Sequence, residues 1–171
     1  MKKFEKVFVA GTFDFLHIGH QYLLWTAVNS AKSLVVIVAR DQNVLRIKGR
    51  KPHFTEQQRI ERIYYSLIGQ NIEGINSTES LVPREVSLNR TEFLPHTEIK
   101  LGGESLDEFL QTLADQKPDA IMLGYDQQLR FPAGKIAELG IEILRCDPFH
   151  PQFFKSSYFR PGVLIPAEAG I

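Results

Sequence analysis

Continuous apolar runs and helix-spaced apolar positions follow one another along the first part of the chain. Residues 7–10 (VFVA) are all apolar and predict a short buried strand. Residues 18–31 repeat their apolar positions every three or four residues, which predicts a helix with one buried side. Residues 34–39 (LVVIVA) are rich in β-branched side chains, as expected for a parallel strand that is buried on both faces.

The later part of the chain repeats this alternation, and two of its helices begin with capping signals. Thr55 and Ser105 each precede a glutamine or glutamate by three residues, which is the spacing of a capping box. We expect the two helices to end near residues 68 and 115. The remaining predicted elements are strands at 120–123 and 141–146, a short helix near 134–139 and a basic loop at 40–54.

This order of elements predicts the fold class. Alternating strands and helices favour one α/β domain over residues 1–171, with a Rossmann-like, mostly parallel sheet and helices on both faces. In such sheets, ligands bind outside the carboxyl ends of the strands. Residues 70–97 form an insertion longer than ordinary connections, and a solvated hairpin, a substrate lid and a subunit contact stay open for it. Residues 161–171 are expected to form an irregular tail.

Composition narrows the class of protein. The 20 Lys and Arg residues balance 20 Asp and Glu residues, so the basic excess typical of nucleic-acid-binding proteins is missing. The single cysteine, Cys146, excludes an internal disulfide framework and fits a reducing compartment. The first apolar run is too short for a signal peptide, and no run is long enough to span a membrane. We therefore expect a cytoplasmic protein that binds neither nucleic acid nor membrane.

The stretch 7–24 (VFVAGTFDFLHIGHQYLL) carries the strongest chemical signal. The first predicted strand would place residues 11–14 at the carboxyl edge of the sheet, next to the amides and dipole of a helix N-terminus. His17 and His20 lie three residues apart and would share one face of the first turn. Gly19 would leave room for a ligand near the backbone. This arrangement predicts a polyphosphate site in which imidazoles donate hydrogen bonds to charged oxygens.

The predicted loop after the second strand could add positive charge to that site. At the carboxyl end of a strand, such a loop could neutralise a triphosphate and hold departing pyrophosphate, although a solvated basic loop is the alternative. A histidine pair could instead bind zinc, but no cysteine or glutamate lies nearby at a suitable spacing, so we expect no metal ligands in the protein. The basic residues of the loop are Arg40, Arg46, Lys48, Arg50 and Lys51.

Residues 11–20 (GTFDFLHIGH) resemble the signature of the cytidylyltransferase-like nucleotidyltransferases. This family has a Rossmann-like fold and moves a nucleoside monophosphate from an NTP to a phosphate-bearing acceptor, releasing pyrophosphate. Class I aminoacyl-tRNA synthetases share the His-x-Gly-His motif but need far more than 171 residues. The resemblance implies catalytic roles for His17, His20 and Lys48 and nucleotide contacts for Gly11, Thr12, Phe13, Asp14 and Gly19.

Further segments resemble archaeal-type FAD synthases, which transfer AMP from ATP to FMN. Residues 38–41 (VARD) and 48–52 (KGRKP) are similar to segments of these enzymes, and residues 117–127 (KPDAIMLGYDQ) match the end of one of their strands. Gly124 would let the nucleotide approach the backbone, while Asp126 would meet the ribose or base, with helix capping as its alternative. The resemblance further implies substrate contacts for Arg40 and Asp41 and nucleotide contacts for Arg50 and Gln127.

Residues 153–160 (FFKSSYFR) partly match the segment with which the family holds the β- and γ-phosphates. Ser156 and Ser157 would offer hydroxyls and amides, and Arg160 would add charge one turn later. A serine helix cap is the alternative. Tyr158 stands where the family often has another hydroxyl residue, so its role stays open.

The resemblance implies a Mg²⁺-dependent adenylyltransferase. The phosphate of FMN would attack the α-phosphorus of ATP in line, giving FAD and pyrophosphate without a covalent enzyme intermediate. The metal would be held through the nucleotide phosphates, and Asp14 could orient the turn or help to position it. The alternatives are transfer from CTP to a small phosphate such as glycerol-3-phosphate, and a non-catalytic nucleotide-binding regulator. The family resemblance also suggests a homodimer.

Two departures from the family pattern concern the acceptor more than the chemistry. Residues 70–97 replace what is a short turn in the compact enzymes of this resemblance. Archaeal-type synthases also tend to carry paired cysteines near the C-terminus, whereas this chain has only Cys146, so thiol-dependent behaviour is not expected.

Overall fold

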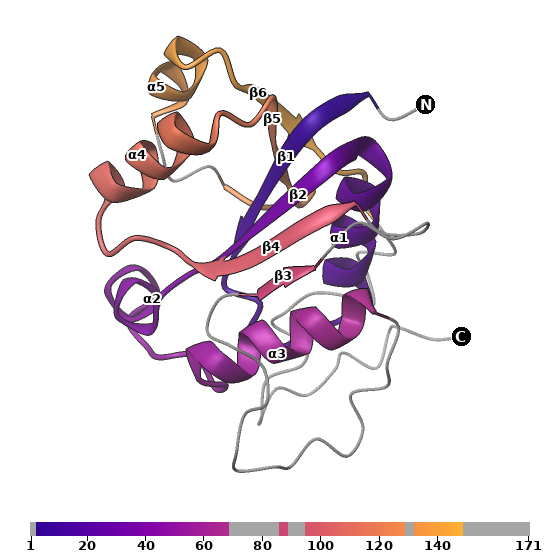
Figure 1. The fold of residues 1–171 in the computed structure, drawn as a ribbon. Coiled ribbons are helices and arrows are strands. Elements are labelled where there is room, and N and C mark those ends of the chain that lie inside the picture. Colours follow the sequence, from indigo (N-terminus) through magenta and orange to yellow (C-terminus); the bar gives the residue numbers. More distant parts are fainter. Residues whose placement is uncertain (1–2, 69–85, 89–94, 129–131, 149–171) are drawn as a thin grey trace.

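The computed structural model describes residues 3–68, 86–88, 95–128 and 132–148, which form a six-stranded sheet in the order β3-β4-β2-β1-β5-β6 (Figure 1). All neighbouring strands pair in parallel except β3 and β4, which are antiparallel. The strands are β1 (Phe4–Gly11), β2 (Ala31–Val38), β3 (Val86–Leu88), β4 (His96–Leu101), β5 (Ala120–Leu123) and β6 (Glu142–Arg145).

Helices cover both faces of the sheet (Figure 1). On one face, Val7 and Val9 of β1 pack in one buried cluster with residues of α1 and α3; on the other, Phe8 packs in a second cluster with residues of α4 and α5. The predicted Rossmann-like α/β fold is therefore confirmed. The helices are α1 (Ile18–Ser30), α2 (Asp41–Lys48), α3 (Glu56–Leu67), α4 (Leu106–Gln116) and α5 (Ala133–Glu138).

The order of the strands locates a ligand site. The chain passes from β1 to β2 and β4 in one direction, and then returns to place β5 on the other side of β1. The connections therefore leave β1 and β5 toward opposite faces of the sheet. In open α/β sheets, ligands bind at such a reversal, outside the carboxyl ends of the strands.

The predicted helix starts at Thr55 and Ser105 are confirmed. The Thr55 hydroxyl accepts the Gln58 N–H at 3.3 Å, and the Gln58 side chain accepts the Thr55 N–H at 3.0 Å, a complete capping box. The Ser105 hydroxyl accepts the Glu108 N–H at 3.1 Å, while the Glu108 carboxylate accepts the N–H of Glu104 instead. Among all the helices described, none has the length and apolar character needed to cross a membrane.

Two predictions from the sequence pattern were wrong. Residues 40–54 are not one loop, because they contain α2, which buries only Val44 and so lacks a recognisable apolar stripe. Strand β4 was missed, because it buries only alternate residues, Thr97 and Ile99, and begins inside the predicted insertion. Of residues 70–97, the structure describes only 86–88 and 95–97, and the predicted tail at 161–171 lies outside the described residues.

Candidate active site

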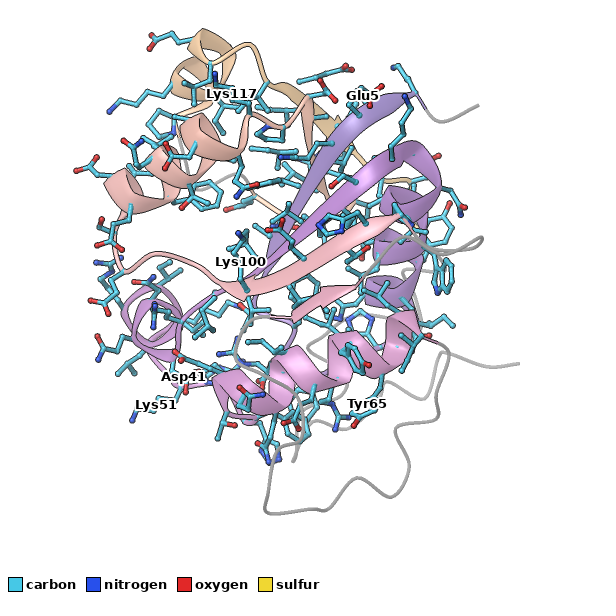
Figure 2. All side chains as sticks on the ribbon, viewed as in Figure 1. Glu5, Asp41, Lys51, Tyr65, Lys100 and Lys117 are labelled. Atoms are coloured by element: carbon cyan, nitrogen blue, oxygen red, sulfur yellow. The ribbon has the colours of Figure 1, made fainter. Side chains whose placement is uncertain are left out.

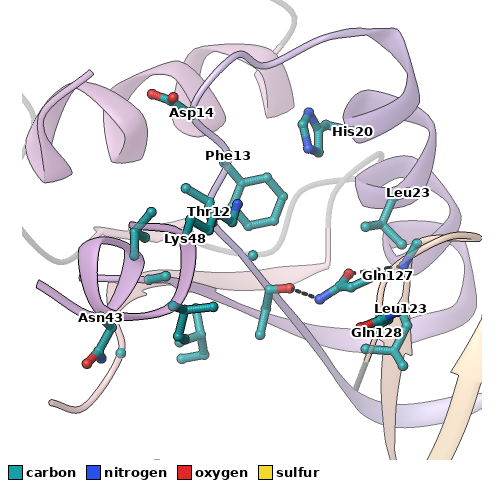
Figure 3. Close-up of a pocket in the computed structure, with 18 of the residues that line it drawn as sticks. Thr12, Phe13, Asp14, His20, Leu23, Asn43, Lys48, Leu123, Gln127 and Gln128 are labelled. Carbon is teal, nitrogen blue, oxygen red and sulfur yellow. Dashed lines mark hydrogen bonds between the residues drawn. The ribbon is translucent and has the colours of Figure 1, made fainter. Parts of the chain in front are cut away.

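A cavity of about 730 Å³ lies at the carboxyl edge of the sheet, at the reversal between β1 and β5 (Figure 3). Residues at or just after the carboxyl ends of the five parallel strands line it, together with the N-terminus of α1, one face of α2 and the start of α4. Twelve of the residues predicted for the site line this one cavity: Gly11, Thr12, Phe13, Asp14, His17, Gly19, His20, Lys48, Arg50, Gly124, Asp126 and Gln127.

Five predicted site residues are not placed in the cavity. Ser156, Ser157 and Arg160 lie outside the described residues, as does Tyr158, whose role was left open. Arg40 and Asp41 are not among the residues that line the cavity, and their contacts with substrate stay a prediction. Their side chains bond to the protein: Arg40 Nε donates to the Gly102 carbonyl at 2.8 Å, and Asp41 pairs with Arg59.

The two histidines cap the helix that follows them. His17 is the N-cap residue of α1, and its Nδ1 accepts the Gly19 N–H at 3.2 Å. His20 Nδ1 accepts the His17 N–H at 3.4 Å, so the pair makes a capping box out of imidazoles. Because Nδ1 is an acceptor in both rings, the proton of each neutral ring lies on Nε2. In the neutral form, each ring is therefore a donor through Nε2 and needs no positive charge to be one.

The surroundings of the histidines favour the neutral form. The ring centroids of His17 and His20 are 3.9 Å apart. Burial of the His20 ring lowers its pKa from 6.5 to about 3, and the nearby His17 and Lys48 act in the same direction. A hydrogen bond with the Phe15 backbone raises the pKa but does not offset these effects. Loss of water also lowers the pKa of His17, although the Asp126 carboxylate acts in the opposite direction. At neutral pH both rings are thus uncharged donors.

The loop after β1 supports these rings and reaches toward α2. Phe13 is 2% exposed and contacts the His20 ring edge-to-face at a centroid distance of 5.4 Å. A side chain at Gly11 would approach the Phe13 ring to 3.0 Å, which explains the small residue at that position. The Thr12 hydroxyl accepts from Lys48 Nζ at 3.0 Å, so the last residue of α2 lies beside the loop after β1 (Figure 3).

Asp14 holds the loop before α3 in place. Its Oδ1 accepts the backbone N–H groups of His53 and Phe54 at 2.7 and 3.0 Å. The carboxylate also lies near Arg62, where it raises the pKa of a guanidinium that burial lowers. Of the two roles left open for Asp14, the geometry supports orientation of the turn. Among the described residues, no cluster of three His, Cys, Asp or Glu could hold a metal ion.

Sequence reasoning missed Arg59, which is fully buried and joins four segments around the cavity. Its Nη1 donates to the carbonyls of Thr12 and Ala39 at 2.7 and 2.8 Å, and its Nε to that of Phe54 at 3.2 Å. Its Nη2 pairs with the carboxylate of Asp41, the first residue of α2. Asp41 lies beside the start of α3, where its N–H donates to the Glu56 carboxylate (Figure 2). Arg59 therefore ties the ends of β1 and β2 to the starts of α2 and α3.

The turn after β5 is held by two side chains. Gln127 Nε2 donates to the Ala10 carbonyl at 2.7 Å, and its Oε1 accepts the Gly124 N–H at 3.2 Å, which joins the turn to β1 (Figure 3). Arg145, which the sequence did not single out, donates through Nη1 to the carbonyls of Gly124, Tyr125 and Gln127 at 2.9, 3.2 and 2.8 Å. The nitrogen and the oxygen of the Gln127 side-chain amide thus both bond to backbone, while Asp126 stays exposed at the cavity.

Comparison with known proteins agrees with this geometry. The family described as Cytidylyltransferase-like matches residues 8–145. The FAD synthase of Thermoplasma volcanium is 31% identical over 163 residues, which cover 93% of this chain and 94% of that protein. The crystal structure titled as the lipopolysaccharide core biosynthesis protein from Thermoplasma volcanium GSS1 is 29% identical, with a TM-score of 0.57 over 85% of this chain and 98% of the other.

We predict that Arg59→Met lowers the free energy of unfolding by about 3 kcal/mol, because three carbonyls and one carboxylate lose their donor. Arg40→Met, which removes one bond from a half-buried side chain, should cost about 1 kcal/mol or less. Urea unfolding of both variants measures the difference. Equal losses would contradict the central position of Arg59.

The depressed histidine pKa values predict a pH dependence of stability. The folded chain keeps His20 neutral down to a pKa of about 3, whereas the unfolded chain takes up a proton near 6.5. The free energy of unfolding should therefore fall as the pH drops from 6.5 toward 3. NMR titration of the ring protons checks the cause directly. A His20 ring that titrates near 6.5 in the folded chain would contradict it.

Proposed function

Since this chain belongs to the cytidylyltransferase-like family and is a nucleotidyltransferase, we propose that it transfers AMP from ATP to FMN, giving FAD and pyrophosphate. The observation that carries the proposal is the pair of neutral imidazoles at the N-terminus of α1, in one cavity with the Lys48 ammonium. The likeness to an FAD synthase over nearly the whole chain supports ATP and FMN as the substrates.

The arrangement suits a direct displacement at phosphorus. The FMN phosphate would attack the α-phosphorus of ATP in line and expel pyrophosphate, with no covalent bond to the protein. His17 and His20 would donate to the oxygens of the crowded phosphorus, where negative charge grows, and the N-terminal amides of α1 would add to this field. Lys48 and Arg50, from α2 and the loop after it, would hold the pyrophosphate.

The remaining assignments rest on the position of each described residue and, for three others, on the sequence. The backbone of residues 11–14 and Gly19 would face the phosphates, and the turn with Gly124 and Asp126 would face the ribose and base. Ser156, Ser157 and Arg160 stay candidates for the β- and γ-phosphates on the strength of the sequence alone. Gln127 would act by orienting the Gly124 turn. We further expect a homodimer that works in the cytoplasm.

Enzymes of this kind use a divalent metal ion, and we propose Mg²⁺. An ion held mainly by phosphate oxygens is compatible with the described residues, which contain no cluster of three ligands, and Asp14 Oδ1 already accepts two backbone N–H groups. Mg²⁺ typically keeps several waters and binds through substrate phosphates with one or two carboxylates. When bound, it would neutralise triphosphate charge and help to orient the leaving group.

Pyrophosphate release in a two-way matrix tests the proposed substrates. ATP and CTP are each offered with FMN, glycerol-3-phosphate and phosphocholine, with Mg²⁺ or with EDTA. We expect turnover only with ATP, FMN and Mg²⁺. Turnover only with CTP would overturn the substrates but not the mechanism, and nucleotide binding without any turnover would favour a regulator built on this fold.

We predict that His17→Asn lowers kcat by about 10²–10³-fold, the scale for loss of one oxyanion donor. Asparagine is a good N-cap residue, so α1 should still form and circular dichroism should be unchanged. The control is His96→Asn, at the start of β4 and outside the cavity lining, which should keep its kcat. A His17→Asn variant with a kcat close to that of the unmodified chain would exclude the proposed role.

A further inference from the structure

The cavity has an apolar end that the phosphate chemistry does not use. We call it the ring slot. Side chains of β2, α4 and β5 line it together with the inner face of α2, and Figure 3 shows Asn43 of α2 across the cavity from Leu123 at the end of β5. The apolar residues of the ring slot are Ile37, Val44, Ile47, Leu106, Phe109, Ile121 and Leu123.

Two large apolar residues of the ring slot are exposed to solvent. Ile47 of α2 is 44% exposed, and Leu106, the first residue of α4, is 36% exposed, yet both line the cavity. Ile47 and Leu106 belong to two different helices, so poor packing of one helix does not explain the exposure of both. Exposed apolar side chains that line a cavity with a few polar groups are typical of a site for an apolar ligand surface.

Helix α2 joins the ring slot to the phosphate-binding end. Asn43 and Ile47 lie one turn apart, as do Val44 and Lys48, and all four line the cavity. Leu45 is 41% exposed on another side of the helix and does not line it. One ligand could therefore place an apolar part against Ile47 and an anionic part against Lys48. This combination suits a ring system that carries a phosphate.

The loop between β4 and α4 is bonded to the N-terminal part of α2 beside the ring slot. Asn43 Nδ2 donates to the Gly103 carbonyl at 2.8 Å, and Arg40 Nε donates to the Gly102 carbonyl, so α2 binds the loop between β4 and α4. A side chain at Gly103 would come within 2.5 Å of the Glu108 Cβ, and one at Gly102 within 3.1 Å of Ile37. The two glycines therefore allow this loop to lie close against α4 and the floor of the ring slot.

We propose that the ring slot receives the flat aromatic ring system of the acceptor, and that Ile47 and Leu106 determine acceptor specificity. This inference rests on the proposed function, because it takes the second substrate to be a ring that bears a phosphate. The nucleoside is assigned to the turn after β5, where Gly124 and Asp126 line the cavity and Asp126 lies close enough to His17 to affect its pKa. A small polar acceptor such as glycerol-3-phosphate would leave the apolar walls in contact with water.

Two variants with a matched control test the ring slot. We expect Ile47→Ser and Leu106→Ser each to raise the KM for FMN about tenfold, since each loses an apolar contact with the ring, and to leave kcat and the KM for ATP unchanged. Leu45→Ser makes a comparable change on the same helix outside the cavity and should keep all three constants. Quenching of riboflavin fluorescence measures ring binding without ATP or turnover, and only the two ring-slot variants should weaken it.

The outcomes separate the ring slot from the proposed function. Suppose that the unmodified chain uses ATP and FMN, and that all three variants keep its KM for FMN. This result would overturn the ring slot and leave the proposed function standing. If the two ring-slot variants raised the KM for ATP instead of the KM for FMN, the nucleobase would bind in the ring slot, and the inference would also be overturned. If the unmodified chain does not turn over ATP and FMN, the proposed function fails, and weaker riboflavin binding by only the two ring-slot variants would still support an aromatic-ring site.

Discussion

One buried guanidinium organises the carboxyl edge of this sheet. Arg59 has no exposed surface, and its bonds run to the Thr12, Ala39 and Phe54 carbonyls and to the Asp41 carboxylate. Thr12 follows β1 and Ala39 follows β2, while Phe54 lies just before α3 and Asp41 is the first residue of α2. Because a buried charge without partners is very costly, the four segments cannot separate without a large loss of stability. The loop that carries the histidine motif and the helix that carries Lys48 are thus held in one arrangement.

The groups that would meet substrate are held in the same way, by the backbone around them. His17 and His20 satisfy amides at the N-terminus of α1, and Asp14 satisfies the amides before α3. Gln127 and Arg145 hold the turn after β5. A site built in this way presents its donors before any ligand binds, so little reorganisation accompanies a growing charge at phosphorus. Its acceptor end is different, because Ile47 and Leu106 still expose apolar surface that a ligand would cover.

The sequence predicted the parallel strands around β1 and most of the cavity lining, because buried strands are continuously apolar and the histidine motif has a fixed place after one of them. It did not predict α2 or β4, whose buried positions are too few to form a pattern. Arg59 carried a signal that could have been used: it lies four residues before Ile63, on the apolar stripe of α3. No sequence signal pointed to Arg145, because its partners are backbone carbonyls of a turn about 20 residues earlier in the chain.

In the proposed function, this cavity positions two phosphates for a single direct transfer. The most direct measurement is the stereochemical course of transfer from one diastereomer of an α-thio-substituted ATP to FMN, followed by phosphorus NMR of the dinucleotide product. A single in-line attack inverts the configuration at phosphorus, so we expect inversion. Retention would require two successive displacements through a covalent enzyme intermediate, and would contradict a single direct transfer.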